Sequence, residues 1–163
     1  MPKKNNIIAP QVDPYTKLLS YAFWLIGRRD YTERDIVTKL TAKKKLKGWD
    51  VSIDHVIERL KELNYIDDRR FVERYIESRT LGNPRGRYLI GRELAFKGIP
   101  RALFDELWER VGVSEINVAR AFLERKKSAL LRATDPKKRR QKIMSLLNGR
   151  GFSPDTIYAI LDL

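Results

Sequence analysis

Three short segments of the same kind recur at a nearly constant spacing and constrain the fold more than any other feature. Each is a basic residue, a glycine and a large apolar residue: Lys47-Gly48-Trp49, Lys97-Gly98-Ile99 and Arg150-Gly151-Phe152. The glycines are 50 and 53 residues apart. Each follows a segment with helical periodicity, and glycine after the last helical turn is the usual left-handed cap. Three copies with a period near 50 residues predict a tandem array instead of one globular core.

The segments between these glycines have the periodicity of helices. Apolar residues in one such segment recur at helical spacing: Ile53, Val56, Ile57, Leu60 and Leu63. No segment alternates apolar and polar residues with the period of a strand. We therefore predict an all-α protein of three tandem three-helix repeats, nine helices in all, that form an elongated, curved body. The expected boundaries are an N-terminal tail at 1–12 and repeats at 13–66, 67–112 and 113–163.

Several helix ends can be predicted from local residues. Thr32, with Asp35 three residues on, is typical of a capping-box start. Asp135 and Ser153 each precede a proline, which indicates a capped helix start with proline in the first turn. Pro100 is expected to be the first residue of another helix. The third repeat is expected to open with one helix that carries Val118, Ala121, Phe122, Ala129 and Leu130 inward.

The charge balance indicates a polyanionic partner. Lysine and arginine number 34 against 21 aspartate and glutamate residues, a net charge of +13. Such an excess suits nucleic acid, an acidic protein surface or anionic lipid, although solubility alone would also account for it. The chain has no cysteine, which excludes disulfides and thiolate sites and fits a reducing compartment.

No segment has the sequence of a signal peptide or a membrane span. The first ten residues, MPKKNNIIAP, lack the apolar stretch of a signal peptide. The longest apolar run, from Ala22 to Ile26, is far too short to cross a bilayer. We expect a cytoplasmic protein with no membrane partner.

Basic residues gather in or beside the second helix expected in each repeat. The candidates for binding nucleic acid or another anion lie in the first and third repeats: Lys43, Lys44, Lys45, Lys47, Lys137, Lys138, Arg139, Arg140 and Lys142. The corresponding part of the second repeat carries Arg85, Arg87, Arg92 and Lys97, all expected to point outward. If the repeats stack in register, these clusters would form one stripe along a polyanion. A solvated helix face is the simpler alternative.

The residues that could suggest an enzyme have simpler interpretations. Asp67 and Asp68 are adjacent, so they point apart on a helix, and a helix cap accounts for them. His55 is the only histidine and has no cysteine or second histidine as a fellow ligand. The loop at 82–86 lacks the Walker pattern. We therefore expect no catalytic residues, no metal site, no cofactor and no enzymatic activity.

Exposed aromatic rings could stack on unpaired bases. Trp49 and Phe152 follow the repeated glycines and are expected to pack at the helix caps instead. The position of Trp24 stays open, because Phe23 and Leu25 compete for the inward face of the same helix.

Two segments of the second repeat resemble signatures of the RecX family. The run LNYIDDRRFV at 63–72 is similar to the family pattern LGYLDDxRFA, with Asn64 in place of the usual glycine. Arg92-Glu93-Leu94 and Lys97-Gly98-Ile99 are similar to the pattern RIxxELxxKGI. The order and spacing of these elements carry the resemblance, because each is short and common by itself. The richer breaker at 82–86 and the extra lysines before Gly48 depart from the pattern.

The resemblance implies an all-α regulator of the RecA recombinase in DNA repair and homologous recombination. It would bind the filament of RecA on single-stranded DNA and inhibit or modulate ATP hydrolysis, strand exchange and filament growth. DNA would be contacted through the filament. Whether the protein also contacts DNA directly stays open. The charged surface of the second repeat would meet the filament, with these candidates: Arg69, Arg70, Arg74, Arg79, Arg85, Arg87, Arg92 and Lys97. We expect the protein to act as a monomer.

An independent DNA-binding protein of the helix-turn-helix kind is the alternative function. Three-helix units can place a helix in the major groove. The third helix of the first repeat, however, carries Asp54, Glu58 and Glu62, and these acids disfavour contact with phosphate.

Overall fold

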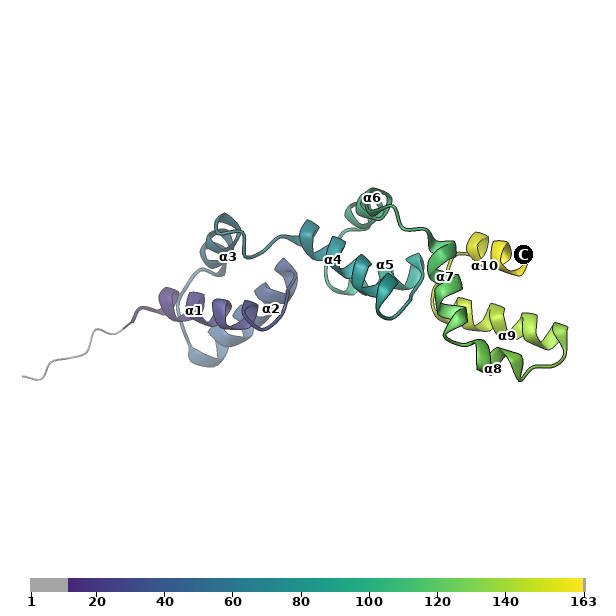
Figure 1. Ribbon diagram of the computed structural model, residues 1–163. Helices are drawn as coiled ribbons and strands as arrows, with labels where there is room; N and C mark the ends of the chain where they lie inside the picture. The colour runs from purple at the N-terminus through teal and green to yellow at the C-terminus, as the bar shows by residue number, and fades with distance from the viewer. Residues whose placement is uncertain (1–11, 163) are drawn as a thin grey trace, which may run out of the picture. The chain divides into compact units, whose positions relative to one another are not determined.

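The computed structural model describes residues 12–162, and within this range the chain forms ten helices and no strand (Figure 1). The prediction of an all-α fold is confirmed. The chain divides into two compact units, which end and begin at Asp67 and Asp68. The predicted N-terminal tail lies outside the described residues, apart from Val12. The repeat boundaries and the curved body stay predictions.

The first unit is a three-helix repeat with one apolar core. Its helices are α1 (Pro14–Ile26), α2 (Glu33–Lys47) and α3 (Ile53–Glu62). Each starts at a polar cap, and Thr32 caps α2 as predicted, accepting a hydrogen bond from the Asp35 amide. All three helices contribute residues with no exposed surface: Leu18, Ala22, Ile36, Leu40, Val56 and Leu60. Leu25 of α1 is also buried in this core, and its neighbour Trp24 is therefore 51% exposed.

The second repeat opens the second unit. Its helices are α4 (Asp68–Leu81), α5 (Arg87–Phe96) and α6 (Arg101–Val111), and α4 packs against both others. The buried residues include Val72, Ile76, Ile90, Leu94 and Leu107. The predicted start of α6 at Pro100 is off by one residue. Pro100 is the N-cap with extended backbone, so its ring precedes the first helical turn.

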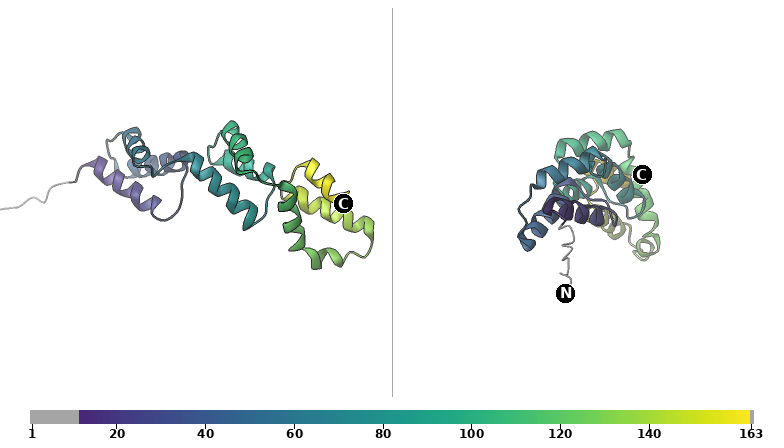
Figure 2. Two further views of the ribbon diagram at one scale, coloured as in Figure 1. Left: turned by 45° about the horizontal axis from the view of Figure 1, so that its top comes forward. Right: turned by 90° about the vertical axis from the view of Figure 1, so that its left-hand side faces the viewer.

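In the third repeat the structure has a short helix in addition to the three that were predicted. The helices of this repeat are α7 (Glu115–Glu124), α8 (Lys127–Leu131), α9 (Pro136–Gly149) and α10 (Pro154–Leu161). The single helix expected through Leu130 breaks after Glu124, and α8 lies beside α9 (Figures 1 and 2). The break allows Leu130 to be buried. The predicted inward position of Ala121 is also wrong, because Ala119 takes that place.

The three repeated glycines are left-handed helix caps, as predicted. Gly48, Gly98 and Gly151 have φ of 62°, 85° and 71°. Asn64, which stands where the RecX pattern has glycine, is left-handed as well, with φ of 57°. Asparagine tolerates this conformation better than most residues, so the departure from the pattern leaves the turn intact.

Candidate functional site: basic surfaces and the joint that positions them

Two loops of the second unit are joined through their backbones. The amide of Gly86 donates to the carbonyl of Arg150 at 2.9 Å, and the amide of Tyr88 donates to the carbonyl of Gly151 at 3.0 Å. A Cβ atom on Gly86 would lie 2.3 Å from the Gly151 oxygen and from backbone atoms of Phe152. Only a residue without a side chain allows this approach. The start of α5 is thus fixed against the turn between α9 and α10.

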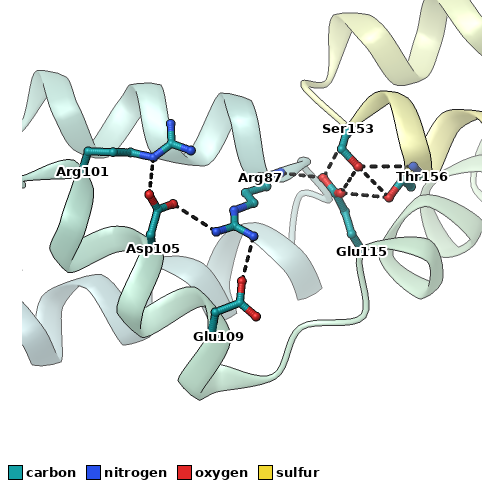
Figure 3. A network of polar contacts seen from close by, with 7 residues as sticks. All are labelled: Arg87, Arg101, Asp105, Glu109, Glu115, Ser153 and Thr156. Atoms are coloured by element: carbon teal, nitrogen blue, oxygen red, sulfur yellow. Dashed lines mark hydrogen bonds and ion pairs between the residues drawn. The ribbon is translucent and has the colours of Figure 1, made fainter.

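The carboxylate of Glu115 completes the joint (Figure 3). Its Oε1 accepts hydrogen bonds from the amides of Arg87, at 2.7 Å, and Ser153, at 3.2 Å. Its Oε2 accepts from the hydroxyls of Ser153, at 2.6 Å, and Thr156, at 2.9 Å. Glu115 is the first residue of α7, and its partners lie at the starts of α5 and α10. One negative charge therefore meets the positive ends of three helices, where the helix dipoles favour an anion.

Two arginines of the third repeat hold the end of α4. The guanidinium of Arg125 donates to the carbonyls of Leu81 and Gly82, both at 2.9 Å. Arg150 donates to the side-chain oxygen of Asn83 at 2.9 Å. Carbonyls at the end of a helix lack partners within the helix, so Arg125 satisfies the α4 terminus, and Arg150 holds the loop that follows it.

The predicted outward orientation of Arg85 is not what the structure shows. Arg85 forms an ion pair with Glu93, and Arg79 lies 3.6 Å from the same carboxylate. The Tyr75 hydroxyl donates to Glu93 at 2.8 Å and accepts from Arg79 at 3.3 Å. The side chains of Arg79 and Arg85 are only 31% and 21% exposed. These two filament candidates belong to an internal network between α4 and α5.

Arg87, also expected to point outward, is turned toward α6. Its guanidinium lies 3.1 Å from Asp105 and 2.8 Å from Glu109 (Figure 3). Arg101 reaches the other oxygen of Asp105 at 2.7 Å. The hydrogen bond from Arg101, reinforced by Arg87, holds the pKa of Asp105 below its usual value. Arg87 thus braces α5 against α6.

The other candidates of the second repeat lie nearer the surface. Arg69 pairs with Glu106 on α6, and its hydrogen bond lowers the pKa of that carboxyl. Lys97 follows α5, with its ammonium 5.8 Å from the ring of Phe71. Arg70, Arg74 and Arg92 are exposed to solvent, and Arg69 is exposed as well despite its ion pair with Glu106. Exposure gives these four side chains access to a partner.

The basic cluster of the third repeat divides into structural and exposed members. Arg139 donates twice to the carbonyl of Ala133, at 3.1 and 3.0 Å. Arg140 and Lys142 donate to other backbone carbonyls at 2.6 and 2.8 Å. Lys137 and Lys138 are exposed at the start of α9, and no carboxylate within residues 12–162 pairs with either. Their charges stand at the positive end of the helix dipole, which opposes folding and attracts an anion.

The basic cluster of the first repeat lies at the opposite end of its helix. Lys44, Lys45 and Lys47 occupy the last turn of α2, where the helix dipole favours cations. Lys43 is partly buried, and its ammonium lies 4.7 Å from the ring centre of Tyr21. All three basic clusters lie in or beside α2, α5 or α9, the helices expected to carry them. The clusters do not occupy equivalent turns, so repeat symmetry alone does not generate a stripe.

The fold and these surfaces define a class of protein, a strongly basic chain of tandem helical repeats in which polar networks join the second repeat to the third. Across residues 12–162, no three or more histidine, aspartate or glutamate side chains gather closely enough to hold a metal ion. In the same range no helix combines the length and apolarity that a membrane crossing requires.

Comparison with known proteins identifies the family. The profile of the third three-helix domain of RecX matches residues 114–161, and that of the second matches residues 67–107. The regulatory protein RecX of Chlorobium phaeobacteroides is 34% identical over 146 residues, 90% of this chain and 92% of that protein. That of Cronobacter sakazakii is 34% identical over 158 residues, 93% and 94% of the two chains. This chain belongs to the RecX family.

A solved structure supports the fold. The crystal structure of RecX from Lactobacillus salivarius superposes with a TM-score of 0.74 at 19% identity. The match covers 91% of this chain and 94% of that one. The resemblance inferred from the second repeat is therefore confirmed by sequence and by fold.

Sequence reasoning missed the joint residues Glu115 and Arg125. The start of α10 at Ser153-Pro154 could be predicted from the sequence, because a capping residue before proline is a local signal. The partners that Glu115 gathers from three helices are set by tertiary packing and leave no local pattern.

Proposed function

We propose that this chain regulates RecA by binding the RecA filament on single-stranded DNA and modulating its ATP hydrolysis, strand exchange and growth. The observation that carries the proposal is similarity to regulatory RecX proteins over nine-tenths of the chain. The protein would act as a monomer, by binding and without catalysis or a cofactor. DNA would be contacted within the filament.

The charge distribution supports a polyanionic partner of this kind. Exposed candidates include Arg70, Arg74 and Arg92 on the second repeat and Lys137 and Lys138 on the third. Glu115 and Gly86 fix these two repeats against each other, so both sets are carried on one body. Binding at several points along a filament gives avidity that no single contact supplies. The predicted filament residues Arg79, Arg85 and Arg87 would act by holding this body together.

The proposal is tested by titrating the protein into RecA that is hydrolysing ATP on single-stranded DNA. A change in the hydrolysis rate at amounts well below those of RecA, with weak binding to naked duplex DNA in the same buffer, is the expected result. An unaffected RecA, together with tight binding to naked duplex DNA, would instead favour the helix-turn-helix alternative.

Removing both exposed lysines of α9 should reduce the salt dependence of filament binding. With Lys137→Ala and Lys138→Ala combined, the slope of log K against log salt should become shallower by about 1 to 1.5, because each phosphate contact on a single strand contributes about 0.7. Anisotropy of a labelled RecA-coated oligonucleotide, measured at several salt concentrations, gives the slope.

A control removes the same charge elsewhere. Arg59 and Lys61 on α3 already pair with Glu62 and Glu33, at 2.9 and 2.7 Å. Replacing both with alanine should leave the slope unchanged. Equal slopes for the two double variants would show that the α9 lysines do not contact the polyanion.

A further inference from the structure

One face of α1 carries aromatic and basic side chains in a single row. Lys17, Tyr21, Trp24 and Arg28 are spaced by four, three and four residues. Residues spaced in this way lie on one side of a helix. Arg28 comes two residues after the last residue of α1 and extends the row beyond the helix end. We call these four residues the α1 row. The core of the first unit takes Leu18, Ala22 and Leu25 from another side of α1.

The rings and cations of this row are already stacked on one another. The rings of Tyr21 and Trp24 lie 5.9 Å apart with an interplanar angle of 17°. The guanidinium of Arg28 lies 3.9 Å above Trp24, and the ammonium of Lys43, from α2, lies 4.7 Å above Tyr21. The order is therefore cation, ring, ring, cation.

Stability alone gives little reason for this arrangement. Trp24 is 51% exposed, so about half of the stabilisation that burial of a tryptophan supplies is not realised. A cation–π pair at an exposed site contributes only about 0.5–1 kcal/mol. A large ring kept at the surface between cations is more useful to a ligand than to the fold.

The sequence segments that form the α1 row and most of α2 are basic and contain no acidic residue. Residues 14–29, which include α1, contain no aspartate or glutamate, and neither do residues 36–49, which make up most of α2. The two helices pack against each other. The basic side chains in these segments are Lys17, Arg28, Arg29, Lys39, Lys43, Lys44, Lys45 and Lys47. Such a surface attracts a polyanion and repels a cationic partner.

We propose that the α1 row binds single-stranded nucleic acid directly, with an unpaired base stacked on Trp24. Arg28 lies on the ring through an exposed, flexible side chain, so it can move aside to a phosphate while the base takes its place. Lys17 and Lys43 neutralise neighbouring phosphates. A duplex has no base face to offer, so the site selects unpaired strands. This binding does not require RecA.

The test compares two oligonucleotides of the same length and charge, oligo(dT) and an abasic strand that has only the sugar–phosphate backbone. Trp24→Ala should weaken oligo(dT) binding on the order of 10-fold, because one base–aromatic stack is lost. The abasic strand should bind both proteins equally and more weakly. Trp24→Tyr, which keeps a ring, should restore most of the affinity. The salt slope should not change, since no cation is removed.

Phe96→Ala is the matched control, because that ring is 79% exposed on α5 of the other unit and its removal should leave both affinities unchanged. Circular dichroism of each variant checks that the fold is retained. Equal weakening on the two strands, no weakening, or no binding of oligo(dT) by the unaltered protein would overturn the proposal. Weaker binding of the RecA filament with unchanged oligo(dT) affinity would make the row a protein contact instead. Since RecA is absent from the main test, failure here leaves the proposed regulation of RecA standing.

Discussion

Replacing Gly86 with alanine is expected to destabilise the second unit by roughly 2–4 kcal/mol, because the new methyl group would be forced into a neighbouring backbone. A Cβ at this position would lie 2.3 Å from the carbonyl oxygen of Gly151 and from two backbone atoms of Phe152. Backbone atoms cannot move aside as a flexible side chain can. The two hydrogen bonds that join the loops should lengthen or break. Urea unfolding, followed by circular dichroism, measures the loss.

Gly149→Ala provides a matched comparison from the same region. Gly149 is the last residue of α9, and no atom lies within 4 Å of the position a Cβ would take. Alanine should therefore be neutral or stabilise the helix by up to about 1 kcal/mol. If the two variants unfold at the same urea concentration, the close approach of the loops is absent in solution.

The helix caps could be predicted because their signals are local. Gly48, Gly98 and Gly151 follow apolar-periodic segments, and each adopts the left-handed conformation that such a position requires. The capping function of Thr32 follows from its hydroxyl, which accepts a hydrogen bond from the amide three residues on. None of these outcomes depends on distant parts of the chain, so the all-α repeat fold was accessible from the sequence.

The break between α7 and α8 could not be predicted in this way. The residues at the break, Glu124 to Lys127, are good helix formers and include no glycine or proline. Tertiary contacts hold the chain on both sides of the break. Arg125 is held by the carbonyls of Leu81 and Gly82, and Lys142 of α9 bonds the carbonyl of Ala129 in α8.

The candidate site was predicted at the level of charge but not of individual roles. Basic residues look alike in a sequence, whereas the structure separates them by their partners. Arg85 and Arg87 pair with acids on their own or a neighbouring helix, and Lys138 reaches solvent. Likewise, the side of α1 on which Trp24 lies depended on whether the core took Leu25 or Phe23, a choice that packing makes.

Glu115 links three helix starts in the joint between the second and third repeats. Its side chain accepts four hydrogen bonds, two from backbone amides and two from hydroxyls. The amides of Arg87 and Ser153 belong to helix starts, which have no acceptor of their own. Without the carboxylate, the starts of α5 and α10 lose both an acceptor and a favourable charge.

Glu115→Ala is expected to cost roughly 2–4 kcal/mol, since a lost cap costs about 1 kcal/mol, and two helix starts and a charge–dipole interaction are affected. Glu115→Gln keeps one acceptor oxygen and should lose about half as much. Amide hydrogen exchange should quicken first at Arg87, Tyr88 and Ser153, ahead of global unfolding. Glu124→Ala, at the exposed end of the same helix, removes a surface pair with Lys127 and should cost less than about 1 kcal/mol. A Glu115→Ala protein as stable as Glu124→Ala, with unchanged exchange at those amides, would show that the repeats are held together by other contacts.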